Sequence, residues 1–70
     1  MNIQVGDEVC LKAPLPYLKT ADPMPMLRPP DLVSPDEIGR VKGLRPLGLI
    51  EVVFRRGTFL IPEERLVLNS

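Results

Sequence analysis

Seventy residues with nine basic and nine acidic side chains make one domain of balanced charge, so strong non-specific binding to nucleic acid or to an anionic membrane is not expected. One cysteine and no histidine exclude an internal disulfide, zinc-finger ligands and histidine-dependent catalytic triads. Because no glycine-rich phosphate-binding motif occurs either, we expect a protein that is not an enzyme and needs no metal or cofactor.

The first predicted strand begins after a Gly6-Asp7 turn and ends at Pro14. Val9, Leu11 and Ala13 alternate with polar or small residues, which is the pattern of a half-buried strand. Cys10 falls on the outer face of this strand. We interpret it as a small structural residue rather than a reactive thiol.

The next segment, residues 14–35, holds seven of the nine prolines and none of the five glycines. Proline fixes φ and lacks an amide donor, so the segment is predicted to be one long, extended, polyproline-II-like loop without strands. Its apolar side chains predict that it folds back onto the domain rather than dangling in solvent. They are Tyr17, Leu18, Met24, Met26, Leu27, Leu32 and Val33.

Four further strands are predicted downstream of the loop. The second covers Ile38–Leu44, with Gly39 and Gly43 on the same face as Val41, a pattern that indicates a bulge, a bend or a close backbone approach. The others are Leu49–Phe54, with Ile50, Val52 and Phe54 facing the core, then Phe59–Ile61 and Leu66–Leu68.

Short connections join these strands. Residues 45–48 fit a type I turn, and residues 55–58 fit a tight turn in which Gly57 supplies a positive φ. Residues 62–65 fit one helical turn. The predicted fold is therefore an all-β, five-stranded SH3-like barrel with one long proline-rich loop between strands 1 and 2.

Two sets of residues resemble known families. The spacing Val5-Gly6-Asp7-x-Val9, Gly39-x-Val41 and Val52-x-Phe54 resembles SH3-like barrels in general. The run Lys19–Asp31, together with Arg55-Arg56-Gly57-x-Phe59-Leu60, resembles the SipA-like family of small cyanobacterial NblS-interacting proteins. This resemblance implies an SH3-like regulator that binds a two-component sensor histidine kinase in light and nutrient-stress signalling. Residues 47–53 depart from it, being aliphatic where the family carries aromatic residues.

The proline-methionine loop is the first candidate partner-binding surface. Methionine adapts to a partner's shape, prolines reduce the entropy lost on binding, and Arg28 can anchor a carboxylate. The alternative is that Met24, Met26 and Leu27 plug one end of a small barrel. The loop candidates are Tyr17, Lys19, Pro23, Met24, Pro25, Met26, Leu27, Arg28, Pro29 and Pro30, and a second, basic face has Arg40, Lys42, Arg55 and Arg56.

Three functions fit these surfaces. The resemblance favours a cytoplasmic, monomeric kinase regulator without membrane insertion. One alternative is a small docking subunit of a photosynthetic or respiratory complex. The other is a nucleic-acid-binding barrel, since five basic residues and one acid lie between Arg40 and Arg56, but balanced charge and few aromatics disfavour it.

Overall fold

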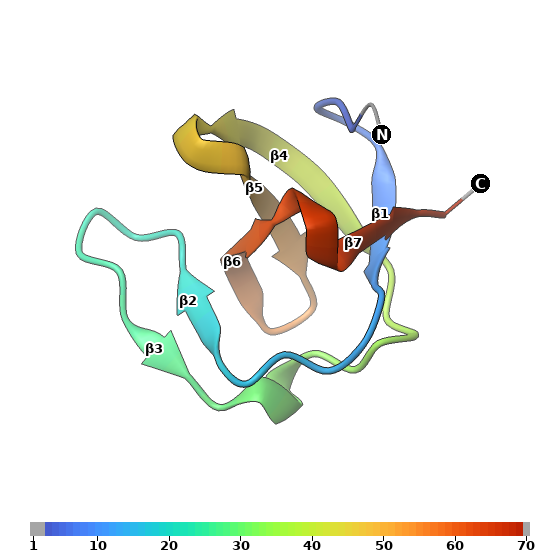
Figure 1. Cartoon of the computed structure of the whole chain (residues 1–70). Helices are drawn as coiled ribbons and strands as arrows, with labels where there is room; N and C mark the ends of the chain where they lie inside the picture. The colour runs from blue at the N-terminus through green and yellow to red at the C-terminus, as the bar shows by residue number, and fades with distance from the viewer. Residues whose placement is uncertain (1–2, 70) are drawn as a thin grey trace.

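The computed structural model describes residues 3–69, which form one antiparallel sheet that curls into a small half-barrel (Figure 1). The strands are β1 (Glu8–Leu11), β2 (Leu18–Thr20), β3 (Leu27–Arg28), β4 (Gly39–Arg45), β5 (Leu49–Phe54), β6 (Gly57–Pro62) and β7 (Leu66–Leu68). Their order in the sheet is β3-β2-β6-β5-β4-β1-β7. The all-β prediction is confirmed, whereas the prediction of five strands is wrong because the sheet has seven.

Three single turns of 3₁₀-helix connect the strands: η1 (Pro30–Leu32), η2 (Pro46–Gly48) and η3 (Glu63–Arg65). The last of these confirms the helical turn predicted before the final strand. Within residues 3–69, no helix has the length and apolar character needed to span a bilayer.

The two additional strands lie inside the segment predicted to be a strand-free loop. Prolines are absent from residues 17–22 and from residues 26–28, and each gap is long enough for a short strand. Leu18 pairs with Arg28 and Lys19 with Leu27, while the other side of β2 pairs with β6. The β2–β3 hairpin, which we call the arm, lies at the left of Figure 1. The proline argument holds at each proline but not for the residues between them.

The core fills the concave side of the sheet and is apolar. The predicted inward faces of β1 and β5 are confirmed except at Ala13, which is exposed because β1 ends at Leu11. The segment 14–35 adds three buried apolar side chains of its own, so it does fold back onto the domain. The core residues are Ile3, Val9, Leu11, Leu15, Leu18, Val33, Val41, Ile50, Val52, Phe54, Phe59, Ile61 and Leu66.

The two glycines of β4, Gly39 and Gly43, lie on different faces of the sheet and have different surroundings. At Gly39 a Cβ atom would lie 2.6 Å from Phe54 Cε1 and from Val52 Cγ1, so the predicted close approach is confirmed. Lys42 forms a bulge between the pairs Val41↔Val52 and Gly43↔Glu51. The extra residue shifts the alternation, and Gly43 therefore faces Glu51 on the outer side. The prediction that it shares the face of Val41 is wrong.

Of the two predicted hairpin turns, the first has a different backbone conformation from the one predicted, and the second has the predicted one. Leu47 has φ 65° and ψ 27°, whereas a type I turn has φ near −90° there, so the type I prediction for residues 45–48 is wrong. Gly57 has φ 146°, a value that L-residues rarely adopt. Its predicted positive φ is confirmed.

Candidate protein-docking surfaces

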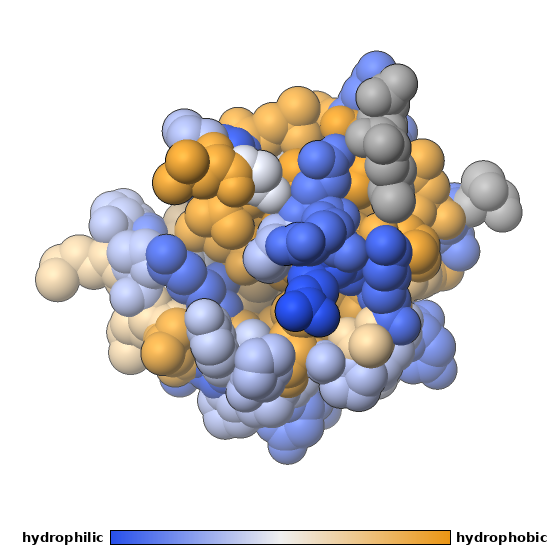
Figure 2. All heavy atoms as spheres, in the orientation of Figure 1, coloured by the Kyte–Doolittle hydropathy of each residue, from blue (hydrophilic) through white to orange (hydrophobic). Residues whose placement is uncertain are grey.

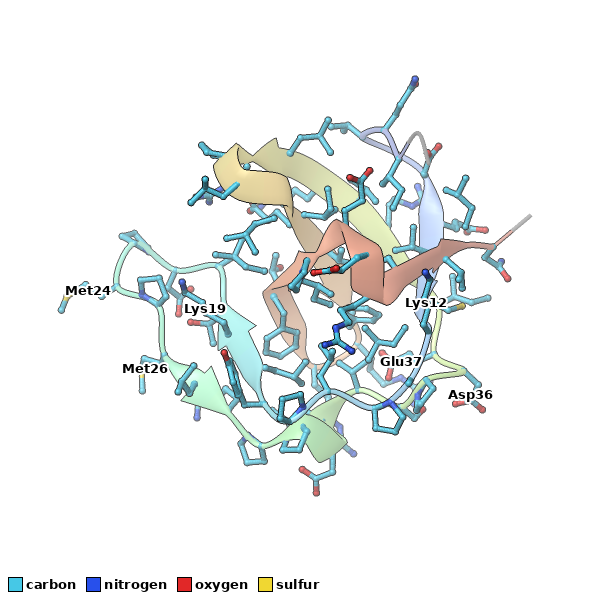
Figure 3. The ribbon with its side chains drawn as sticks, in the orientation of Figure 1. Lys12, Lys19, Met24, Met26, Asp36 and Glu37 are labelled. Carbon is cyan, nitrogen blue, oxygen red and sulfur yellow. The ribbon has the colours of Figure 1, made fainter. Side chains whose placement is uncertain are left out.

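The tip of the arm carries the exposed methionines. The side chain of Met24 is 84% exposed and that of Met26 is 54% exposed, and Figure 3 shows both pointing away from the sheet. Leu27 on β3 is exposed as well. The alternative in which these three side chains plug the barrel is therefore wrong. The side chains of this segment that are buried in the core are Leu15, Leu18 and Val33.

Hydrogen bonds hold the arm in one shape. The Met26 N–H donates to Thr20 Oγ1 and the Thr20 N–H donates to the Met26 carbonyl, each at 2.9 Å. The Ala21 N–H also donates to the Thr58 carbonyl at 3.1 Å, which fixes the arm to β6. A surface held in place in this way loses little entropy when a partner binds.

A concave site at the base of the arm brings two arginines together. This arginine hollow has a volume of about 370 Å³ and is lined by Thr20, Asp22, Arg28, Leu32, Arg56, Gly57, Thr58 and Phe59. Arg28 comes from β3 and Arg56 from the β5–β6 turn. The sequence analysis assigned these two arginines to separate surfaces. Neither arginine belongs to an ion pair within residues 3–69, so both guanidinium groups are available to a partner's carboxylates.

The other basic residues do not join this hollow. Arg40 pairs with Glu8 at 3.7 Å and Arg45 with Glu51 at 3.0 Å, and Arg45 lies at the opposite end of β5 from the β5–β6 turn. Lys42 is exposed on the bulge of β4. The structure therefore divides the predicted basic face into separate sites.

Arg55 lies in an acidic neighbourhood of its own. Arg55 lines a hollow with Ser34, Asp36, Glu37 and Ile38, and its backbone N–H donates to Glu37 Oε2 at 2.9 Å. The Ser34 hydroxyl donates to Asp36 Oδ1 at 2.7 Å. This bond, followed by the backbone N–H of Asp36, lowers the pKa of the Asp36 carboxyl below its ordinary value.

A second concave site, the apolar groove, lies on the outer side of β6. It has a volume of about 260 Å³ and is lined by Leu15, Pro16, Tyr17, Lys19, Leu49, Leu60, Pro62 and Arg65. Phe59 and Ile61 face the core, so Leu60 between them faces outward and is not part of the core cluster. Sequence reasoning included Tyr17 and Lys19 among its candidates but missed Leu60. The alternation along β6 was the signal that could have found it.

These surfaces carry side chains that are common at protein interfaces. Exposed methionines, an aromatic ring, unpaired arginines and apolar walls are the side chains found at protein interfaces. Among residues 3–69, no three His, Cys, Asp or Glu side chains are placed to hold a metal ion.

Comparison with known proteins decides the family. Residues 5–66 match the CRR42-like family, described as "Protein CHLORORESPIRATORY REDUCTION 42-like". The chain belongs to the CRR42-like family. No curated protein and no solved structure matches it.

Membership of the CRR42-like family overturns the SipA-like identification, and with it the prediction of a two-component kinase regulator. That identification used the proline-methionine run 19–31 and the turn sequence Arg55-Arg56-Gly57-x-Phe59-Leu60. A proline-rich loop and a glycine-containing turn reflect turn and core requirements, which many small β domains share. Similarity of this kind is not specific to one partner.

Proposed function

We propose that this CRR42-like chain is a small, non-catalytic docking protein that serves a photosynthetic or respiratory complex in chlororespiratory reduction. The family name supports the process. The shape of the chain supports the role, because its exposed features are contact surfaces. We also infer that the sheet is a variant of the SH3-like barrel, in which a long excursion precedes a three-stranded meander and a 3₁₀ turn precedes the last strand.

The observation that carries the proposal is the arm. Met24 is 84% exposed at the end of a hairpin that Thr20 closes with hydrogen bonds in both directions. Met26 and Leu27 on the same hairpin are also more than half exposed, and a group of exposed apolar side chains on a fixed support is typical of a contact site. Arg28 and Arg56 at the base of the arm add two unpaired cations.

The test replaces the wild-type gene with tagged variants in the native organism. The arm variant is Met24→Ser with Met26→Ser, and its matched control is Val5→Ser with Ile38→Ser, two side chains that are also more than half exposed. The hollow variant is Arg28→Gln with Arg56→Gln. Its control is Lys42→Gln with Arg55→Gln, which removes the same charge elsewhere.

Two measurements decide the outcome. On native gels the wild type and both controls are expected to migrate with a membrane complex, and the arm and hollow variants to migrate alone with unchanged melting temperatures. The rise in chlorophyll fluorescence after illumination reports dark reduction of the quinone pool. This rise should be smaller in the arm and hollow variants than in the wild type and the two controls. Co-migration of the arm and hollow variants at wild-type levels would refute the proposed surface, and the absence of any such complex would refute the function.

A further inference from the structure

The apolar groove is separate from the arm, and the residues that line it restrict which partner segment could bind there. Leu60 is only 9% exposed, yet it is not part of the core cluster and it lines the groove. Tyr17 and two prolines line the groove as well. Tyr17, the only tyrosine in the chain, is 52% exposed and lies beside the apolar side chain of Leu60 in the lining of the groove. A partly exposed aromatic residue beside an apolar surface is typical of a contact site.

The polar side chains around the groove are almost all hydrogen-bond donors. Lys19 and Arg65 line it, and neither forms an ion pair with a carboxylate within the described residues. Lysine and arginine have donors only, and no acidic side chain lines the groove. An occupant must therefore bring acceptors, above all carboxylates. Its own backbone N–H groups would find few side-chain partners, so residues that lack an N–H fit best.

We propose that the apolar groove binds an extended, acidic, proline-containing segment of a partner protein. Proline rings pack against Tyr17 and Pro62 without bringing an unpaired donor, and acidic residues on either side meet Lys19 and Arg65. The volume of about 260 Å³ suits two or three side chains of an extended segment, rather than a helix face. The inference deepens the proposed function by naming the chemistry of one partner segment.

Leu47, in the β4–β5 turn, is close to the groove in sequence but does not line it. It precedes Leu49, a groove residue, by two positions, and its side chain is 97% exposed. Its φ of 65° is unfavourable for a leucine. Figure 2 shows hydrophobic surface over this turn and hydrophilic surface over η3. A bound segment that continues beyond Leu49 would cover this strained and exposed side chain.

The single tyrosine provides an assay without labels. The chain has one tyrosine and no tryptophan, so its intrinsic fluorescence reports Tyr17 alone. The probe is a short synthetic peptide of alternating proline, leucine and aspartate, free of aromatic residues. One control peptide has asparagine for aspartate, and another has alanine for proline. We expect saturable quenching or enhancement by the acidic proline peptide, and weaker binding by both controls.

Charge variants of the protein identify the groove. Arg65→Gln and Lys19→Gln should each weaken binding of the acidic peptide by up to about fivefold, the range of exposed ion pairs. Arg55→Gln removes the same charge away from the groove and should leave binding unchanged. Leu47→Asn should weaken binding while raising the urea midpoint of unfolding, since asparagine accepts this φ more readily. A merely structural leucine would not give this opposite pair of changes.

Several results would overturn the inference. They are no spectral response to the acidic peptide, equal binding of all three peptides, or equal effects of Arg65→Gln and Arg55→Gln. Concentration-dependent dimerisation that changes the Tyr17 signal would assign the groove to a second copy instead. The assay uses purified protein, so its failure leaves co-migration with a complex intact, and loss of co-migration leaves peptide binding intact.

Discussion

Substituting Gly39 by alanine tests the tightest contact in the sheet. Gly39 is buried on β4, and its φ is not positive, so alanine can adopt the backbone conformation. Its Cβ atom would lie 2.6 Å from both Phe54 Cε1 and Val52 Cγ1 and 2.8 Å from Phe54 Cδ1. Carbon atoms prefer separations of about 3.5–4.0 Å. Both neighbours belong to β5, which pairs with β4, and both are core residues, so neither can move freely.

The expected cost follows from these overlaps. Overpacking by one methyl group costs about 1–3 kcal/mol, and alanine returns about 0.4–1 kcal/mol by restricting the unfolded chain. Because two of the contacts are as short as 2.6 Å, the overpacking cost lies in the upper part of its range, and the net loss of unfolding free energy is about 1–2.5 kcal/mol. Unfolding entropy of about 2.1 cal/mol/K per residue gives roughly 150 cal/mol/K for this chain. The melting temperature should fall by about 7–17 °C.

Thermal unfolding followed by circular dichroism measures the change, and Gly43→Ala is the matched control. The Cβ atom of that variant would meet Glu51 Oε1 at 3.3 Å, the far end of a flexible side chain, so its melting temperature should stay near the wild-type value. Combining Gly39→Ala with Val52→Ala should cost less than the sum of the two single changes, because the smaller side chain makes room. Equal melting temperatures for Gly39→Ala and Gly43→Ala would refute the close approach.

Three further changes have defined outcomes. Thr20→Val removes the acceptor of the Met26 N–H, so unfolding free energy should fall by about 1 kcal/mol and hydrogen exchange at Met26 should accelerate; unchanged exchange would contradict the bond. Ser34→Ala should raise the pKa of the Asp36 carboxyl toward its ordinary value, as a carbon-13 NMR titration can show. Because the folded pKa is lowered, the stabilisation is present above the unfolded pKa and disappears as pH falls through the folded one. Leu47→Asn should stabilise the isolated protein by roughly 1 kcal/mol in urea unfolding, and a lower midpoint would argue against strain at that φ.

The sequence predicted those parts of the fold that depend on local alternation and turn chemistry. The inward face of β5, with Ile50, Val52 and Phe54, follows from the pattern alone, as does the positive φ of Gly57. The strands β2 and β3 could not be predicted in this way. They have three and two residues, and the pairing of β2 with β6 joins segments about 40 positions apart.

The candidate sites show the same division. The sequence predicted that Met24 and Met26 are candidate partner-binding residues, because the prolines around them disfavour regular secondary structure. It could not bring Arg28 to Arg56 or Tyr17 to Leu60, since both meetings depend on the cross-strand register of β2 with β6. The family resemblance was wrong for a related reason. The composition of the loop and the sequence of the β5–β6 turn describe a small curled sheet without identifying what binds to it.

The bulge at Lys42 also bears on how chains of this kind can differ in length. Losing a residue from a strand ordinarily exchanges its inner and outer sides. Here Lys42 is the extra residue of the bulge, between the residues that pair with Val52 and Glu51. Its loss would restore regular one-to-one pairing between β4 and β5. Leu44 and Arg45 would keep their partners Ile50 and Leu49. The strand would straighten, and the curvature of the half-barrel would change before its interior did. Gaps in relatives are thus best tolerated at this one position of β4.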